Sequence, residues 1–438
     1  MILSIDIGGT FTDFIVMKDG ITHFKVPSTP DTPEEAIKEG LERKDIGIDR
    51  VDEIFHGTTI ATNAFLEKKG IETAFITNSG FEDLLFIGRQ TRPELYELNF
   101  EKPTPPLKKE NTFGLPCRID EDGEVLREFS EEEVRAVAER LDEKDISAAV
   151  CLLHSYKSAK HEGKIGGILD EYEIPYSLSS EVTGEFREYE RGLTTLLDAY
   201  LSPLLKDYFS SVTDILEKEP YIMKSGGGLE KASKVESVDT LYSGPAGGVA
   251  GGAYLADQLE VSNMVTFDMG GTSADMATII DGEITWKDQG KIGDFPVQSK
   301  MIDIVTVGSG GGSIARCDEG GALRVGPESA GADPGPICYG RGGERPTVTD
   351  ALLLMGYIDP GFFLGGDIAL DMEKTERAIE SLSKKLKMGF EETLMGIFKV
   401  ANSKMARTMK KITVERGLSP EEFSILAFGG AGPLHAAS

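Results

Sequence analysis

Apolar and polar residues alternate in several short stretches of the chain, and two of these stretches lead into closely similar glycine-rich segments. The apolar run MILSIDI enters the segment DIGGTFTD, and the run NMVTFDM enters the segment DMGGTSAD. In both places a second apolar run and then an Asp-Gly pair follow, at positions 19–20 and 281–282. Because Asp-Gly between apolar runs is a strong hairpin signal, each region is predicted to form strand, tight glycine turn, strand, Asp-Gly turn and strand.

Helical spacing of apolar residues dominates other parts of the chain. A capping box at Ser130 and Glu133 precedes apolar positions 134, 137 and 141, and the segment 31–33 predicts the start of a helix that runs through Leu41. Further helices are predicted over 186–216, with an interruption near Pro203, and over 391–416, while 148–153 is predicted to be a buried strand. This alternation predicts an α/β protein. We place the main boundary near residue 185, giving domains 1–185 and 186–438, with later chain able to complete the first.

Comparison of the chain with itself shows that the two glycine turns are copies of one motif. Residues 6–13 and 268–275 are identical at five of eight positions. Adjacent glycines let the backbone approach a ligand closely, and successive amides form a concave anion site. The residues predicted to contact the phosphates of a nucleotide are Gly8, Gly9, Thr10, Thr12 and Asp13 in the first turn, and Gly270, Gly271, Thr272 and Ser273 in the second. The alternative is a pair of ordinary turns with solvated aspartates, and Asp13 and Asp275 can equally be braces of the turns.

The first aspartate of each copy has a separate predicted role. A carboxylate beside a polyphosphate would repel it unless a divalent cation intervened. Asp6 and Asp268 are therefore predicted to hold Mg²⁺, directly or through its water molecules.

Composition and charge narrow the classes of function. A net charge of −28 argues against a nucleic-acid-binding face, and no apolar run is long enough to span a membrane. The N-terminus enters a strand pattern without a signal-like segment, which predicts a cytoplasmic protein. The four cysteines are scattered and are predicted to be reduced, mostly buried thiols. Among the histidines, His56 opens the segment HGTT, with Asn63 downstream; a structural histidine and a ligand-facing one are equally compatible with this pattern.

The order of further motifs extends the pattern over the whole chain. They are HGTTIATNAFLEKKG (56–70), CLLHSY (151–156), SGPAGGVAGG (243–252), VGSGGGSIA (307–315), GPESAGADPGPICYGRGG (326–343), PTVTDALLLMG (346–356) and AFGGAGPLH (427–435). With the two glycine turns, this series resembles the hydantoinase A / 5-oxoprolinase family, which belongs to the actin-like ATPase and sugar-kinase superfamily. The resemblance implies two actin-like, ribonuclease H-like domains with a nucleotide cleft between them.

The resemblance also implies functional roles. Residues 6–13 and 268–275 match the two phosphate motifs, Gly310 and Gly311 belong to a further glycine loop, and Gly429 and Gly430 match the adenosine-contacting motif. Asp268 is expected nearest the γ-phosphate and Asp6 at a water ligand of Mg²⁺. Such enzymes use ATP to phosphorylate a carbonyl oxygen of a cyclic amide or ketone, and a hydantoinase B-like partner subunit then takes part in hydrolysis or carboxylation. His56, Thr58, Thr59 and Asn63 are candidates for the substrate side, and residues 84–118 for specificity.

Two other functions stay open on the sequence alone. One is a small-molecule kinase that releases a stable phosphorylated product, and the other is a non-catalytic, ATP-dependent chaperone or reactivating factor. Members of the family that the sequence resembles continue beyond the AFGGAGPLH segment, so a second domain shortened at its C-terminus is expected.

Overall fold

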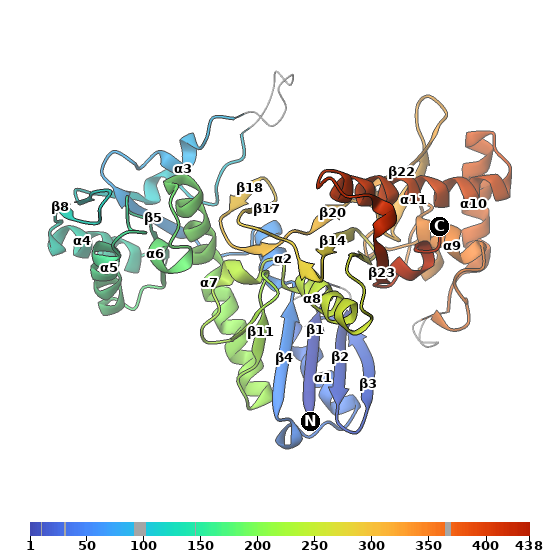
Figure 1. The fold of residues 1–438 in the computed structure, drawn as a ribbon, viewed down its shortest axis with the longest axis horizontal. Coiled ribbons are helices and arrows are strands. Elements are labelled where there is room, and N and C mark those ends of the chain that lie inside the picture. The colour runs from blue at the N-terminus through green and yellow to red at the C-terminus, as the bar shows by residue number, and fades with distance from the viewer. Residues whose placement is uncertain (10, 30–31, 92–101, 145, 364–368) are drawn as a thin grey trace. The chain divides into compact units, whose positions relative to one another are not determined.

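A computed structural model describes residues 1–9, 11–29, 32–91, 102–144, 146–363 and 369–438 (Figure 1). The chain divides into two compact units. The first comprises Met1–Ala246 and Trp286–Met301, and the second comprises Gly247–Thr285 and Ile302–Ser438. The stretch Trp286–Met301 thus interrupts the second unit in the sequence but belongs to the first. Compact units need not coincide with domains, so the domain boundary near residue 185 stays a prediction.

The first unit is built on a six-stranded sheet that begins with the predicted hairpin. Strands β1 (Ile2–Ile7), β2 (Phe11–Met17) and β3 (Ile21–Pro27) are antiparallel neighbours, as predicted. The sheet continues from β1 through β4 (Glu53–Thr58), β11 (Tyr221–Met223) and β12 (Leu229–Lys231), in the order β12-β11-β4-β1-β2-β3. Alternate residues of β1, namely Leu3, Ile5 and Ile7, are buried. Helix α1 (Pro33–Arg43) contributes Ile37 and Leu41 to the same core, and it begins with the predicted proline in its first turn.

A second sheet of the first unit is parallel throughout. Its order is β10-β9-β5-β6, with β5 (Thr73–Asn78), β6 (Thr112–Leu115), β9 (Ser147–Val150) and β10 (Tyr176–Leu178). Helices α4 (Glu131–Asp142) and α5 (Lys160–Glu171) share its core. The capping box at Ser130 and Glu133 is present as predicted, with Val134 and Leu141 buried. The buried strand predicted over 148–153 is confirmed in β9, although it ends at Val150.

Helix α7 (Glu188–Leu216) corrects one prediction. The interruption expected near Pro203 is absent, and the helix runs for 29 residues. A proline removes the amide that would bond the carbonyl four residues earlier, here that of Ala199. The Ser147 hydroxyl donates to Ala199 O at 2.9 Å and replaces that bond. A side chain from another element therefore compensates for the amide that the proline lacks. The spacing of apolar residues along the helix cannot predict such a contact.

The second unit has a five-stranded sheet that repeats the hairpin. Strands β13 (Met264–Met269), β14 (Ala274–Ile280) and β15 (Glu283–Ile284) are antiparallel neighbours, β23 (Ser424–Phe428) is parallel to β13, and β20 (Val305–Val307) pairs with β14. Both residues of the Asp281-Gly282 pair have positive φ, as the tightest hairpin turns require. Helices α9 (Val348–Leu354), α10 (Met372–Leu386) and α11 (Phe390–Val414) share one core with β13 and β14. Helix α11 confirms the helix predicted over 391–416.

Helix α8 (Ser243–Gln258) uses small residues to approach the sheet of the second unit. A Cβ at Gly248 would lie 2.6 Å from the Phe428 ring, and one at Gly252 would lie 2.6 Å from the Thr266 side chain. The remaining helices are α2 (Ile60–Leu66), α3 (Leu84–Ile87), α6 (Ser179–Val182) and α12 (Gly432–His435). The remaining strands form short pairs: β7 (Arg118–Ile119) with β8 (Val125–Arg127), β16 (Trp286–Lys287) with β19 (Met301–Ile302), β17 (Gly290–Ile292) with β18 (Phe295–Val297), and β21 (Ser313–Cys317) with β22 (Leu323–Ser329).

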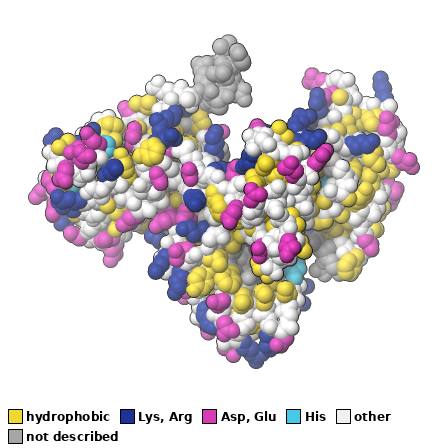
Figure 2. Space-filling view, in the orientation of Figure 1, with side chains coloured by type: hydrophobic (Ala, Val, Ile, Leu, Met, Phe, Trp, Pro, Cys, Tyr) yellow, Lys and Arg dark blue, Asp and Glu magenta, His cyan; other side chains and the backbone are white. Residues whose placement is uncertain are grey.

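The fold is therefore of the mixed α/β class, as predicted, whereas the two actin-like domains stay a prediction. The four cysteines are free thiols, and Cys117, Cys151 and Cys338 are buried. Among the helices that the structure describes, none combines the length and the apolar character needed to cross a membrane. On the face drawn in Figure 2, acidic side chains are interspersed with basic ones, which is typical of a solvated surface.

Candidate functional site

The first glycine turn joins β1 to β2 beside strand β4. The Gly8 amide donates to Phe11 O at 3.0 Å, and Asp6 lies opposite Asp13 in the ladder. On its other side Asp6 pairs with Gly57 of β4, where a Cβ would lie only 2.8 Å from Asp6 Oδ1. A Cβ at Gly9 would meet no atom within 4 Å, so this part of the turn borders open space. Thr10 lies outside the described residues.

The side chains around the first turn have different roles. Protein surrounding the carboxyl group of Asp6 raises its pKa by desolvation, and repulsion from Asp13 adds to this effect, although part of the side chain reaches solvent. Asp13 itself contacts β3 through His23 Nε2 at 2.8 Å and Lys25 Nζ at 3.1 Å. Asp13 thus braces the hairpin, whereas Asp6 is an exposed carboxyl group at the end of β1.

Thr12 is directed into the protein. Its side chain is fully buried, and Thr12 Oγ1 lies 3.1 Å from Ser28 Oγ. Ser28 Oγ in turn donates to Gly8 O at 2.7 Å. Thr12 therefore takes part in holding the glycine turn from behind, and its predicted contact with phosphate stays a prediction.

The second turn, between β13 and β14, repeats this geometry. The Gly270 amide donates to Ser273 O at 3.0 Å, and Asp268 lies opposite Asp275. Asp275 Oδ1 accepts a hydrogen bond of 2.6 Å from Thr306 Oγ1, which places Asp275 in the bracing role of Asp13. Gly271 and Thr272 are exposed at the tip of the turn. The two turns thus share the same backbone hydrogen bond and the same register between their strands, as well as a similar sequence.

A glycine loop, 308–313, is seated on the second turn. The Gly311 amide donates to Gly270 O at 3.0 Å, and the Gly312 amide donates to Gly271 O at 2.6 Å. A Cβ at Gly310 would lie 2.6 Å from three backbone atoms of the turn. Such an approach leaves no room for a Cβ at position 310 unless the backbone of the turn moves. The Thr349 amide at the start of α9 donates to Gly311 O at 2.7 Å and holds the loop from the other side.

The segment 429–432 meets the same end of β13. Gly429 has φ 78°, and a Cβ there would lie 2.2 Å from Asp268 Oδ1. The Ala431 amide donates to Met269 O at 2.9 Å, and Gly430 borders open space. Loop 308–313 and the segment 429–432 therefore both pack against the second turn or the end of the strand that leads into it.

The candidates for the substrate side lie close together after β4, but they differ in exposure. Thr58 is buried, and its backbone carbonyl accepts from Ser243 Oγ at 2.5 Å. Thr59 Oγ1 donates to Ile7 O at 3.3 Å and accepts from Asn63 Nδ2 at 3.3 Å, with Asn63 itself exposed. These hydrogen bonds tie the start of α2 to the end of β1.

His56 has the surroundings of a structural histidine. It is buried, with Nδ1 3.2 Å from Ile5 O and Nε2 2.7 Å from the Tyr208 hydroxyl. Burial lowers the pKa of His56 to about 4. Both ring nitrogens are engaged inside the protein, which supports the structural alternative over a contact with ligand.

Replacement of His56 by Gln is expected to change how stability depends on pH. Between pH 6.5 and about 4 the unfolded chain takes up a proton that folded His56 does not, so the wild-type protein loses stability as pH falls, by about 1.4 kcal/mol per pH unit from this group. His56→Gln lacks this loss and should approach wild-type stability as the pH is lowered, in urea titrations at pH 7, 6 and 5. His23→Gln, at an exposed site of the same unit, is the control. A difference between His56→Gln and wild type that does not vary with pH would contradict the expectation.

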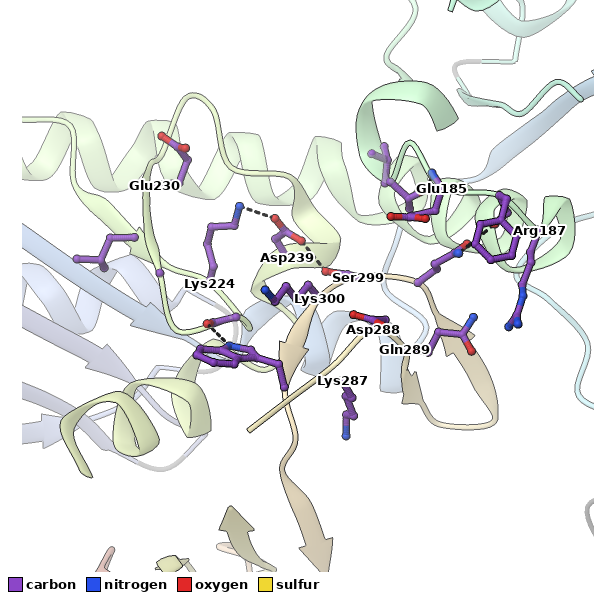
Figure 3. Close-up of a pocket in the computed structure, with 18 residues that line it drawn as sticks. Glu185, Arg187, Lys224, Glu230, Asp239, Lys287, Asp288, Gln289, Ser299 and Lys300 are labelled. Atoms are coloured by element: carbon purple, nitrogen blue, oxygen red, sulfur yellow. Dashed lines mark hydrogen bonds and ion pairs between the residues drawn. The ribbon is translucent and has the colours of Figure 1, made fainter. Parts of the chain in front are cut away.

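A pocket of about 1100 Å³ lies wholly within the first unit (Figure 3). Its lining comes from three stretches, 182–187, 224–239 and 286–300. Trp286, Gln298 and Lys300 were missed because nothing in a single sequence indicates that the stretch 286–301 returns to the first unit. The predicted specificity region, 84–118, falls partly on residues 92–101, outside the described residues.

The chain is similar to known proteins over nearly its whole length. Residues 2–173 match the model of the hydantoinase/oxoprolinase N-terminal region, and residues 191–438 match the hydantoinase/oxoprolinase model. An uncharacterized protein of Methanocaldococcus jannaschii is 39% identical, over 99% of this chain and 68% of its own length. The acetophenone carboxylase gamma subunit of Aromatoleum aromaticum is 35% identical, over 99% of this chain and 64% of its own length.

A solved structure shows the same fold. The crystal structure of the ATP-dependent caprolactamase from Pseudomonas jessenii matches with a TM-score of 0.87 and 31% identity, over 100% of this chain and 67% of that one. The chain spans about two thirds of the length of these three proteins. The resemblance found in the sequence is thereby confirmed, and the chain belongs to the hydantoinase/oxoprolinase family.

Proposed function

We propose that the chain binds ATP at its two glycine turns and phosphorylates a carbonyl oxygen of a cyclic amide or a ketone. The observation that carries this proposal is the seating of loop 308–313 on the turn 270–273, beside Asp268. It brings glycine backbone together at the end of a strand, where successive amides can hold phosphate oxygens. The ATP-dependent caprolactamase with the same fold supports the choice of nucleotide.

Phosphorylation gives a reason for the use of ATP. The oxygen of an amide or ketone is a poor leaving group, and phosphate is a good one. The activated species would then be hydrolysed or carboxylated with a partner subunit of the hydantoinase B kind. Names such as acetophenone carboxylase gamma subunit support the existence of a partner. We place the two turns on one nucleotide, in the actin-like arrangement that the sequence resemblance implies, within a cytoplasmic protein.

The residues present fit a magnesium ion held largely through water. In the described part of the chain, no group of three or more His, Cys, Asp or Glu side chains is gathered that could cage a metal ion. Mg²⁺ commonly keeps several water ligands and takes one or two carboxylates. Asp6, with its raised pKa, and Asp268, against Gly429, would supply these carboxylates. The ion would neutralise charge on the phosphates.

The residues of the proposed nucleotide site then have separate roles. Amides of Gly9 and Gly271, with the hydroxyl groups of Thr272 and Ser273, would hold phosphate oxygens, while Gly8 and Gly270 would close the two turns and let the phosphate approach the backbone. Asp268 would orient the reacting groups at the γ-phosphate, while Gly310 and Gly311 support the second turn. Gly429 and Gly430 would border the adenosine. Catalysis would consist of positioning and charge neutralisation.

Calorimetric titration with a non-hydrolysable ATP analogue, with and without Mg²⁺, tests the nucleotide site. We expect magnesium-dependent binding that Asp6→Asn and Asp268→Asn weaken. Asp281→Asn makes the same chemical change at the far end of the second hairpin, where φ is 51°, and should bind as wild type does. Equal binding by wild type and Asp268→Asn would contradict the assignment.

ATP turnover in the presence of small cyclic amides, ketones and the partner subunit tests the reaction. Stimulation by these compounds with release of the hydrolysed or carboxylated product is the expected result. A stable phosphorylated product would instead identify a kinase. Stimulation by a protein client alone would identify a chaperone or reactivating factor.

A further inference from the structure

Asp350, in the first turn of helix α9, carries a carboxylate that is completely buried in the second unit. Asp350 Oδ2 accepts from the Thr347 amide at 2.8 Å, from the Thr347 hydroxyl at 2.8 Å and from the Ile337 amide at 3.3 Å. Asp350 Oδ1 accepts from the Cys338 amide at 2.8 Å. Burial of a carboxylate is costly, and these four uncharged donors offset that cost.

Capping of the helix accounts for only part of this arrangement. Thr347 is the N-cap residue of α9, and it forms a reciprocal capping box with Asp350. In such a box the acid bonds the amide of the N-cap residue and nothing further along the chain. The amides of Ile337 and Cys338 belong to a different segment, 330–338. The Asp350 carboxylate therefore joins the start of α9 to that segment.

The start of α9 is one of two supports of the glycine loop 308–313. The Thr349 amide, one residue before Asp350, donates to Gly311 O at 2.7 Å. A Cβ at Gly311 would lie 2.7 Å from Thr349 Oγ1, so the side chain of Thr349 also lies close to the loop. A shift of the first turn of α9 would therefore move Gly311.

The segment 330–338 is the other support of the loop. The Ala330 amide donates to Gly312 O at 2.8 Å. The Gly335 amide donates to Ala330 O at 3.2 Å, which connects this contact to the end of the segment that Asp350 holds. The two segments joined by Asp350 thus bond two successive carbonyl groups of the loop.

The same two loop residues contact the second phosphate turn with their amides. Gly311 N donates to Gly270 O, and Gly312 N donates to Gly271 O. Each of these two residues therefore accepts from a support with its carbonyl group and donates to the turn with its amide. The position of the turn depends in this way on the supports, and the position of the supports relative to each other depends on Asp350.

We propose that Asp350 is a positioning residue for the γ-phosphate of ATP. Its carboxylate fixes the two supports, which hold Gly311 and Gly312 against the turn 270–273, where the phosphate would bind. Asp350 itself is buried and does not meet the nucleotide. This inference rests on the proposed function and adds a residue that controls the geometry of the same site.

Calorimetric titration of the full chain with a non-hydrolysable ATP analogue and with ADP, both with Mg²⁺, tests the proposal. Only the analogue has a γ-phosphate, to which the second turn is assigned. Asp350→Asn replaces one acceptor oxygen by an amino group, so the amide of either Thr347 or Cys338 loses its acceptor. We expect roughly tenfold weaker binding of the analogue and nearly unchanged binding of ADP.

Two variants of Thr347 test the same contact if Asp350→Asn does not fold. Thr347→Val removes one hydroxyl donor from Asp350 and keeps the backbone amide. It should weaken binding of the analogue by about threefold and leave binding of ADP unchanged. Thr347→Ser keeps the hydroxyl group and should bind both nucleotides as wild type does.

Ile379→Ala is the control for a loss of stability alone. Ile379 lies in α10 and is fully buried in the core that α10 shares with α9. This variant should unfold at a lower temperature with an unchanged ratio of the two affinities. The same unchanged ratio in Asp350→Asn or Thr347→Val would show that Asp350 only stabilises the fold and would overturn the proposal. If wild type binds neither nucleotide, the proposed function itself fails, and this inference fails with it.

Discussion

Gly310→Ala is expected to lower the affinity for an ATP analogue by about tenfold or more, although position 310 need not touch the nucleotide itself. The new methyl group would lie 2.6 Å from the Gly271 carbonyl carbon and oxygen and from Thr272 N. All three are backbone atoms, so relief requires a shift of the second turn, and overpacking of this kind costs about 1–3 kcal/mol. The displaced turn would no longer present its amides in the arrangement that binds phosphate. Calorimetric titration measures the loss.

Gly308→Ala is the matched control for this prediction. It makes the same change in the same loop, but a Cβ at position 308 would meet no atom within 4 Å. Near wild-type affinity is expected. Equal affinities of the two variants would show that the contact between the loop and the turn does not govern nucleotide binding.

Arg191→Met is expected to destabilise the first unit by about 1–3 kcal/mol or more, because it removes the donor that a hydroxyl group and two backbone carbonyl groups share. Arg191 is 1% exposed. Its guanidinium donates to Ser179 Oγ at 3.1 Å, to Glu185 O at 2.7 Å and to Leu152 O at 2.8 Å. Ser179 Oγ in turn donates to the fully buried Glu162 at 2.7 Å. Urea or thermal unfolding monitored by circular dichroism measures the loss.

Arg135→Met serves as the control for Arg191→Met. Arg135 also pairs with a glutamate, Glu171, but at the surface of the same unit. Exposed pairs contribute little, so the unfolding transition should barely move. A similarly small effect of Arg191→Met would mean that Glu162 is satisfied without a buried cation.

The sequence predicted those features that depend on neighbouring residues. The two hairpins, the capping box at Ser130 and the helix α11 are all specified within a few turns of chain, and the structure contains each of them. The family, too, was identified correctly, because its motifs are contiguous segments in a fixed order.

Features that depend on contacts between distant segments were not predictable in the same way. Pro203 predicts a helix break in the sequence, and the helix continues because the Ser147 hydroxyl donates to the carbonyl of Ala199. Thr12 lies in the first motif, but only its burial and its contact with Ser28 show that its side chain is directed inward. The pocket around Trp286 combines three distant stretches, and no spacing rule connects them.

Trp286–Met301 belongs to the first unit but lies within the second in the sequence, and this affects how the protein folds during synthesis. Ile292, Val297 and Met301 belong to the hydrophobic core of the first unit, although the chain reaches them only after building part of the second. A nascent chain that has emerged as far as Ala246 therefore holds an unfinished core, with apolar surface exposed to aggregation. Completion requires contacts of long sequence separation, which slow folding. The two units are thus interdependent during biogenesis, and cutting the gene between them would yield no fragment that contains the whole first core.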